Sequence, residues 1–271
     1  MRLPRRLGHG DQVPLTDHLT ELRARVIVCL SVLAITFGLA YGFRKEVIDF
    51  LYRPIPDDLR DNIITLSVAE PFITSLTVSL WAGIAVALPI VLWQIWGFIA
   101  PAFSASDQRV VSRLVFVGSL LFVGGVAFAY FIVLPAAIPF LLGFDSEIYD
   151  IQIRARDFLS FSWVTMLAVG LVFELPMVLL GLVRLGILSA DKLRSNRRIG
   201  IVVAVTVAVV LPGVDPVTTI IEAIPLLILF ETTIWLSVYF ERRWLAAAER
   251  EAAQAENENP ENENPNTPSD P

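Results

Sequence analysis

Long apolar stretches with few or no charges dominate the pattern of this chain. They cover residues 26–43, 72–96, 114–137, 158–183, 199–211 and 217–240. An α-helix rises 1.5 Å per residue, so about 20 apolar residues cross the roughly 30 Å hydrocarbon core of a bilayer. The fifth stretch is short and reaches only about 20 Å, which requires local bilayer thinning or shielding by partners. The pattern predicts an all-α membrane protein with six transmembrane helices, the fifth of them short.

Composition supports this class. Of 271 residues, 55% are apolar and only 18% are charged, and the mean hydropathy is +0.65. A soluble domain carries about 25% charged residues. One soluble core could not bury the excess of apolar side chains.

The net charge of −6 belongs to the end of the chain. From Glu249 onward there are seven acids and one base, so residues 1–248 are neutral overall. The end is rich in Asn, Glu and Pro, a composition that cannot bury enough apolar surface to fold. We therefore divide the chain into an N-terminal cytoplasmic extension (1–13), a six-helix membrane domain (14–243) and an acidic, disordered cytoplasmic tail (244–271).

The distribution of Lys and Arg predicts the orientation in the membrane. Fifteen of them lie on the side that holds both termini, and six lie on the opposite side. Because cytoplasmic loops carry the excess of Lys and Arg, both termini are predicted to be cytoplasmic. The two long outer loops mix apolar and polar positions, and we expect them to hold short helices that cap the bundle.

Few residues are available for cofactor or catalytic chemistry. Cys29 is the only cysteine, and His9 and His18 are the only histidines. An intrachain disulfide and a Cys- or His-based metal site within the membrane are therefore excluded. No phosphate-binding, zinc-protease or serine-hydrolase motif is present. We expect no enzyme, no cofactor, no metal and no nucleic-acid partner.

Two acids near the cytoplasmic side have local explanations. Glu21 lies on an amphipathic helix, residues 14–25, at i,i+4 spacing from Arg25, which favours a weak helix-surface ion pair. Asp107 completes Ser-Ala-Ser-Asp, residues 104–107, a capping box at the start of the third span.

Two further acids lie in or beside the spans. Glu174 is deep in the fourth stretch, where a charged residue costs about 2.5–3.5 kcal/mol, and Pro176 permits a kink there. Both a neutral structural acid and a functional acid remain open for Glu174. Asp215, in the hairpin between the fifth and sixth stretches, is explained as a cap of the sixth helix.

Several motifs together resemble one family. The chain is similar to TatC, the multispanning core component of the twin-arginine protein translocase, over roughly residues 15–243. The motifs, in chain order, are HLTELRARV (18–26), WQIWGFIAPAFSASDQR (93–109), FAYFIVLPAAIPFL (128–141), FLSF (158–161), VFELP (172–176), GILSADKLRSNRR (186–198) and PGVDP with AIP (212–225).

The resemblance implies a function. Members of this family bind signal peptides that carry two consecutive arginines. With single-span TatA/TatB-type partners they move folded precursor proteins outward, using the proton motive force. The resemblance further implies a concave helix bundle in a prokaryotic plasma membrane, contact with membrane lipid, and assembly as a homo-oligomer.

The resemblance also implies a signal-peptide site. Glu21 and Asp107 match the two acidic positions of the family, although the second is usually Glu. Phe98 and Pro101 match the FxxP of the recognition loop, and Arg23 matches the arginine of the ELR signature. Carboxylates suit this role because guanidinium groups bind them bidentately.

A second set is implied for partner contact. Glu174 matches the intramembrane glutamate of the fourth span, and Asp215 matches the acid after the fifth. The family often has Ser-Gln downstream of that acid, where this chain has Thr218 and Thr219.

Two other readings of the residues remain. In an ion-coupled solute transporter, Glu174, Glu222 and Glu231 would form a proton relay, although the chain shows no internal repeat of the kind common in such folds. A passive membrane scaffold explains the spans but not an acid at membrane depth.

Overall fold

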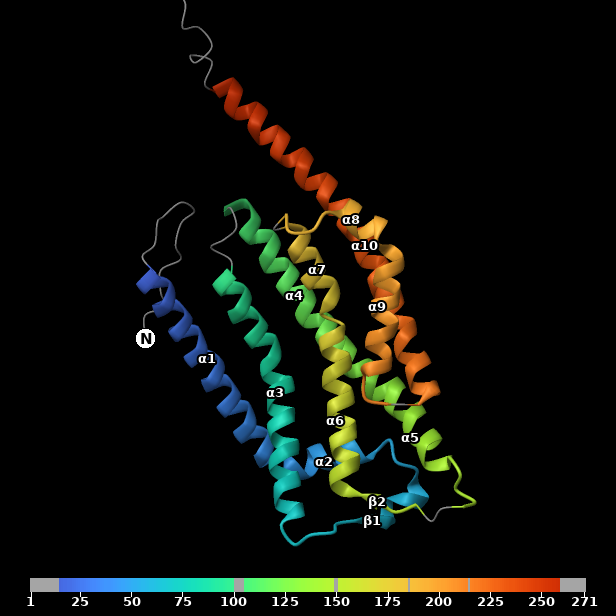
Figure 1. Ribbon diagram of the computed structural model, residues 1–271. Coiled ribbons are helices and arrows are strands. Elements are labelled where there is room, and N and C mark those ends of the chain that lie inside the picture. The colour runs from blue at the N-terminus through green and yellow to red at the C-terminus, as the bar shows by residue number, and fades with distance from the viewer. Residues whose placement is uncertain (1–14, 100–104, 149–150, 185, 214, 259–271) are drawn as a thin grey trace, which may run out of the picture.

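The computed structural model describes residues 15–99, 105–148, 151–184, 186–213 and 215–258. Within these ranges the chain is mostly helical (Figure 1). The elements are α1 (Leu15–Gly42), α2 (Arg44–Tyr52), η1 (Asp57–Asn62), β1 (Ile63–Ile64), α3 (Glu70–Ile99), α4 (Ala105–Phe128), the π-helical turn η3 (Ala129–Val133), α5 (Leu134–Gly143), β2 (Ile153–Arg154), α6 (Ala155–Val172), α7 (Leu175–Arg184), α8 (Ala190–Ser195), α9 (Arg197–Val210) and α10 (Pro216–Glu258).

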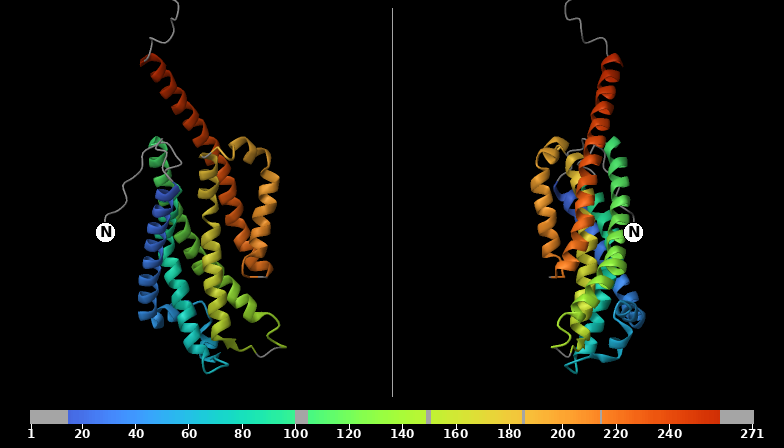
Figure 2. Two further views of the ribbon diagram at one scale, coloured as in Figure 1. Left: turned by 60° about the vertical axis from the view of Figure 1, so that its left-hand side comes forward. Right: turned by 90° about the vertical axis from the view of Figure 1, so that its right-hand side faces the viewer.

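The long helices stand side by side in one bundle (Figures 1 and 2). Helix α1 packs mainly on α3, which also contacts α4 and α6, and α10 packs on α7 and α9. Five helical segments of the described chain are long and apolar enough to cross a membrane, namely His18–Gly42, Glu70–Ile99, Ser112–Gly143, Ala155–Arg184 and Pro216–Ala246. The 14-residue α9 corresponds to the predicted short fifth stretch.

Small residues allow the helices to approach closely. A Cβ atom added to Gly83 of α3 would lie 2.9 Å from the Cα of Phe37 in α1. A Cβ on Gly125 of α4 would lie 2.9 Å from the Cα of Gly170 in α6. Tight backbone packing of this kind replaces the hydrophobic driving force that is missing between helices in lipid. The spacing of α1, α3, α4 and α6 therefore depends on these glycines.

Two of the long helical segments are interrupted. Helix α6 ends at Val172 and α7 begins at Leu175, so the helix is interrupted just before Pro176, where the sequence permits a kink. No feature of the sequence pattern indicates the π-helical turn η3 between α4 and α5. In that turn Tyr130 donates a 2.8 Å hydrogen bond from its hydroxyl to the carbonyl of Phe50 in α2.

The end of the bundle opposite the N-terminus of α1 holds the short elements. It contains α2 and η1 between α1 and α3, where short helices are expected. Between α5 and α6, where they are also expected, the described residues hold only β2, whose parallel pairing with β1 the pattern did not indicate. Beside this pairing, Arg154 donates to Glu70 through Nε (2.8 Å, Oε1) and Nη2 (3.1 Å, Oε2). The hydrogen bond from Arg154 to Glu70 raises the pKa of Arg154 above its usual value.

Helix α10 extends further than the sequence analysis expects. It continues to Glu258, so residues 244–258 are helical, whereas we assign them to the disordered tail. The segment LAAAEREAAQAE is rich in Ala, Glu, Gln and Arg, which are among the strongest helix formers. Intrinsic propensity therefore carries the helix beyond its apolar part, as the projecting end of α10 in Figure 1 shows.

Candidate functional site

Glu21 stands near the start of α1, beside the C-terminal end of α3. Helix α1 is continuous from Leu15 to Gly42, so the amphipathic segment leads into the span as the sequence predicts. Glu21 and Arg25 are one helical turn apart on the same face and form the expected ion pair, with 2.6 Å between Arg25 Nη2 and Glu21 Oε1. The local interpretation of Glu21 is confirmed, but it accounts for only part of the geometry.

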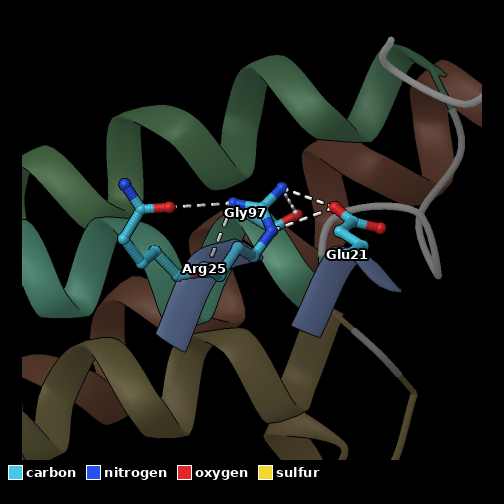
Figure 3. A network of polar contacts seen from close by, with 4 residues as sticks. Glu21, Arg25 and Gly97 are labelled. Atoms are coloured by element: carbon cyan, nitrogen blue, oxygen red, sulfur yellow. Dashed lines mark hydrogen bonds and ion pairs between the residues drawn. The ribbon is translucent and has the colours of Figure 1, made fainter. Parts of the chain in front are cut away.

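Arg25 links α1 to α3 (Figure 3). Its Nε donates to Glu21 Oε1 at 2.9 Å, and its Nη2 donates to the carbonyl of Gly97 at 2.9 Å. Its Nη1 donates to the side-chain oxygen of Gln94 at 3.2 Å and to the Gln94 carbonyl at 3.4 Å. The guanidinium is thus held by two helices and keeps a single orientation.

The Glu21 carboxylate is only half used by these contacts. Both donors of Arg25 that reach Glu21 bind the same oxygen, Oε1. Within the described part of the chain, the other oxygen, Oε2, has no hydrogen-bond partner and is shielded, and the side chain as a whole is 12% exposed. A shielded carboxylate oxygen without a donor is costly, so it is a strong acceptor for an added charged donor.

Gly97 makes room for this arrangement. A Cβ atom at Gly97 would lie 2.3 Å from Nη1 of Arg25, so any side chain here would displace the guanidinium. On the other side of the α3 end, a Cβ atom at Gly181 of α7 would lie 2.7 Å from the Trp96 ring. The α3 end is therefore fitted closely against both α1 and α7.

An aromatic contact lies one turn before Glu21. The rings of His18 in α1 and Phe98 in α3 stack with centroids 4.3 Å apart and an interplanar angle of 19°. The stack and the hydrogen bonds of Arg25 join the same two helix ends, the start of α1 and the C-terminal end of α3. Of the residues predicted for the signal-peptide site, the structure brings Phe98 and Glu21 to neighbouring positions on this surface.

The other predicted members of the site are placed differently or not described. Arg23 is exposed, and two residues along a helix bring it to a different face from Glu21. Pro101 lies outside the described residues. The backbone of Asp107 lies in the first turn of α4, but its side chain is not among those that the structure describes.

Glu174 lies at the break between α6 and α7. It is buried, and its Oε1 has no hydrogen-bond partner. A Cβ atom at Gly118 of α4 would lie 2.6 Å from its Oε2, so the glycine provides the space for this carboxylate. The backbone carbonyl of Glu174 accepts from Met177 at 2.9 Å and from Val178 at 3.1 Å, which starts α7.

Asp215 caps α10, as the local interpretation predicts. Its Oδ1 accepts a 2.8 Å hydrogen bond from the Thr218 backbone amide, and its Oδ2 accepts from the Thr218 hydroxyl. The Asp215 carbonyl accepts the Thr219 hydroxyl at 2.9 Å. In this chain Thr218 and Thr219 therefore serve the cap.

The acids suggested for a proton relay differ in their surroundings. Glu231 pairs with Arg197 of α9 at 2.8 Å, so its charge is already compensated. Glu222 is fully buried, and in the described ranges neither of its carboxylate oxygens has a hydrogen-bond partner. Only the ion-paired Glu231 is thereby removed from such a relay. In the described parts of the chain, no group of three or more His, Cys, Asp or Glu is placed to hold a metal ion.

Sequence reasoning missed two members of the site. Gln94 and Gly97 were not singled out, although both lie in the motif WQIWGF. The available signal was a polar side chain and a glycine three residues apart near the end of an apolar run. Such spacing places both on one face of the helix.

Comparisons with known proteins agree with the motifs. A family model described as Sec-independent protein translocase protein (TatC) matches residues 17–225. The Sec-independent protein translocase protein TatC of Aquifex aeolicus is 37% identical over 235 residues, covering 85% of this chain and 97% of that protein. The one from Magnetococcus marinus is 33% identical over 246 residues, covering 90% of each.

Solved structures show the same relationship. A crystal structure of the twin-arginine translocase receptor TatC in DDM superimposes with a TM-score of 0.70 at 37% identity, covering 81% of this chain and 99% of the other. A second crystal structure of that receptor gives a TM-score of 0.68 at 36% identity, covering 82% and 98%. Sequence motifs, family model, relatives and fold all lead to one conclusion: the chain belongs to the TatC family of Sec-independent protein translocase proteins, and it is a membrane-embedded component of protein transport.

Proposed function

We propose that this chain is the receptor subunit of a twin-arginine translocase. Its Glu21 carboxylate, together with Asp107, binds the paired arginines of a signal peptide. With TatA/TatB-type single-span partners, it then moves the folded precursor across the membrane using the proton motive force. The proposal includes six spans in a prokaryotic plasma membrane with both termini cytoplasmic, so that the two acids face the side from which precursors arrive.

One observation carries the proposal: the Glu21 carboxylate has one oxygen held by Arg25 and the other without a donor. An incoming guanidinium supplies the missing donors. The carboxylate is already oriented by contacts that reach α3, so little rotamer entropy is lost on binding. A shielded, pre-oriented acceptor suits a receptor that must distinguish arginine from lysine, because only arginine offers a planar fork of donors.

Asp107 supplies the second carboxylate in this proposal. Helix α4 begins at Ala105, so residue 107 belongs to its first turn. That turn follows the segment after α3, which ends at Ile99. Two consecutive arginines need two carboxylate acceptors. Phe98 and Pro101 lie between these two acceptors, Glu21 and Asp107, along the sequence. Arg23 lies on another face of α1 and contributes only to the edge of the signal-peptide surface.

Peptide binding tests this proposal directly. Full-length protein in detergent is titrated with a fluorescent signal peptide that carries Arg-Arg, and with a matched peptide that carries Lys-Lys. We expect tight binding of the Arg-Arg peptide only, and loss of that binding when Glu21→Ala is combined with Asp107→Ala. Equal binding by the double variant and the wild type would refute the assignment.

Crosslinking in native membranes tests the location. A photoreactive residue at position 98 should form adducts with a precursor whose signal carries Arg-Arg and not with its Lys-Lys control. Equal adducts with both precursors would show that this surface does not select the signal.

We infer that Glu174 and Asp215 contribute to contacts with partner subunits. These partners are the TatA/TatB-type proteins and a second copy of this chain. Glu174 supports this because it is a buried acid at a helix break, next to a glycine, and its Oε1 has no hydrogen-bond partner among the described residues. Glu174→Ala should reduce transport of a precursor while leaving binding of the Arg-Arg peptide unchanged. Unchanged transport in membrane vesicles would remove the assignment. The side chain of Asp215 is already explained by the cap of α10. We therefore expect Asp215→Asn to reduce precursor transport less than Glu174→Ala does.

A further inference from the structure

A small cavity lies at the opposite end of the bundle from the candidate site. Its volume is about 210 Å³, and it is formed between the first turns of α3 and α6. The lining residues are Ile73, Thr74, Thr77, Val78, Arg156, Leu159, Ser160 and Trp163. A guanidinium, hydroxyl groups and an indole therefore share a cavity with aliphatic side chains.

Two polar groups of the lining have no hydrogen-bond partner among the residues that the structure describes. Thr74 is 6% exposed, and its hydroxyl oxygen makes no hydrogen bond. The indole Nε1 of Trp163 is shielded and also lacks an acceptor. Buried polar groups are nearly always hydrogen-bonded, so unpaired donors lining a cavity indicate that an acceptor enters it.

Arg156 is available for an anion. The neighbouring acids are both turned toward Arg154: Glu70 binds it at 2.8 Å, and Asp157 lies 3.7 Å from it. No ion pair within the described part of the chain involves Arg156, which is exposed at the second residue of α6. The positive ends of the α3 and α6 dipoles face the same region, because both helices start here.

The depth of these groups favours a lipid. Arg156 lies in the first turn of an apolar span, at the level where headgroups meet hydrocarbon. Trp163 lies two turns deeper, but helical side chains lean toward the helix N-terminus, so its ring reaches back toward Arg156. Its ring stacks on that of Trp81 in α3 with centroids 4.0 Å apart, which keeps the indole in place. The aliphatic lining by Ile73, Val78 and Leu159 continues along the spans.

We propose that this cavity binds the phosphate and glycerol region of an anionic phospholipid, with Arg156 on the phosphate and with the Thr74 hydroxyl and Trp163 Nε1 donating to its ester oxygens. The aliphatic part of the lining receives the start of an acyl chain. The site is separate from the signal-peptide surface and does not depend on the receptor proposal.

Lipid titration of the full-length protein tests the site. The protein in detergent micelles is titrated with phosphatidylglycerol, and bound lipids are counted by native mass spectrometry. Arg156→Gln should weaken the tightest lipid site about tenfold, the size expected for a lost charge-assisted hydrogen bond. The matched control is Arg53→Gln, which removes an exposed guanidinium near the same end that lies over Phe50 and outside the cavity.

Thr74→Val gives an independent readout. Because valine removes an unpaired buried hydroxyl, the variant should unfold at the same or a higher temperature than the wild type without lipid. The stabilisation caused by added phosphatidylglycerol should then be smaller than in the wild type. This combination separates a lost ligand contact from a damaged fold.

The following results would overturn the proposal. Arg156→Gln and Arg53→Gln could weaken lipid binding equally, which would mean unspecific charge attraction. Inorganic phosphate alone could displace the lipid, which would identify a free anion as the occupant. A photoreactive residue at Ile73 in native membranes could capture a polypeptide in place of lipid, which would identify the cavity as part of a protein interface.

Discussion

Among the described residues, two of the glutamate–arginine pairs, Glu21–Arg25 and Glu70–Arg154, lie at opposite ends of the bundle, and they differ in how completely the carboxylate is satisfied. In Glu70, both oxygens accept: Oε1 binds Arg154 at 2.8 Å, and Oε2 binds Arg154 at 3.1 Å and the Leu66 amide at 3.0 Å. In Glu21, both donors of Arg25 bind one oxygen, and the other is unpaired. Both oxygens of Glu70 are therefore hydrogen-bonded within the protein, whereas Glu21 keeps one oxygen as an acceptor for a ligand.

The difference comes from where each arginine is anchored. Arg154 directs its fork of two nitrogens at one carboxylate, the bidentate geometry that guanidinium favours. Arg25 presents the same two nitrogens to Glu21, but both bind Oε1, because Nη2 and Nη1 also donate to Gly97 and Gln94 of α3. The same two residue types thus form a structural ion pair at one end of the bundle and a candidate binding group at the other.

The same isosteric substitution at each end should separate these roles, and it gives the largest expected effect. In Glu21→Gln the carboxylate charge is lost, and each hydrogen bond to a charged group contributes about 1.5–3 kcal/mol. The Arg-Arg signal peptide should therefore bind about 10- to 100-fold more weakly. Fluorescence anisotropy with the purified full-length protein measures this change.

Glu70→Gln is the matched control. It should lower the unfolding temperature of the protein in detergent, because Arg154 and the Leu66 amide lose their charged acceptor. Its affinity for the peptide should stay within about twofold of wild type, a difference smaller than one lost neutral hydrogen bond. If both variants lost binding to a similar degree, the contrast between the two pairs would have no functional meaning.

The second effect concerns the anchoring of Arg25. Lysine keeps the charge but has a single ammonium, which cannot reach Glu21, Gln94 and Gly97 at once. We expect Arg25→Lys to weaken peptide binding by about 5- to 10-fold, because the carboxylate is less firmly oriented. Arg44→Lys, at the opposite end of α1, should bind the peptide as the wild type does. Unchanged affinity in Arg25→Lys would show that orientation of Glu21 is unimportant.

Much of the fold is predictable because the spans are long apolar runs. Helix α3 covers residues 70–99 where the pattern predicts 72–96, and α9 covers 197–210 where it predicts 199–211. The pairing of β1 with β2 and the π-helical turn η3 were not predictable, since two-residue strands and one extra residue per turn leave no periodic signal. The extension of α10 over residues 244–258 differs from the prediction, because their acidic composition is typical of disorder while their helix propensity is high.

The candidate site was only partly predictable for a similar reason. The i,i+4 spacing of Glu21 and Arg25 predicts their pair, because both lie on the same helix. Contacts from Arg25 to Gln94 and Gly97 bridge two helices, and they depend on how closely α1 approaches α3. That approach is permitted by Gly83, whose significance no local pattern reveals. Tertiary packing therefore decides which oxygen of Glu21 stays free.

The third effect tests the space around Arg25. In Gly97→Ala, the new Cβ would meet Nη1 of Arg25 at 2.3 Å, so the guanidinium must shift. We expect peptide binding about three- to fivefold weaker, less than for Arg25→Lys because the donors remain. Gly124→Ala is the control, since a Cβ there has no neighbour within 4 Å. A loss of binding in both alanine variants would point to a general effect on the bundle.

The smallest effect concerns the aromatic stack beside Glu21. Phe98→Leu keeps an apolar side chain but removes the ring that stacks on His18 at 4.3 Å. Stacked aromatic pairs contribute about 0.5–1.5 kcal/mol beyond their buried area. Leucine keeps an apolar side chain at the position next to the bound peptide, so only the part of this energy that fixes the helix ends is lost, and the affinity should fall about twofold. Phe140→Leu, which breaks the contact with Phe144 at the other end, should leave the affinity unchanged. A larger loss in Phe98→Leu than in Arg25→Lys would mean that the ring itself contacts the signal peptide, and the aromatic surface would then outrank the carboxylate in recognition.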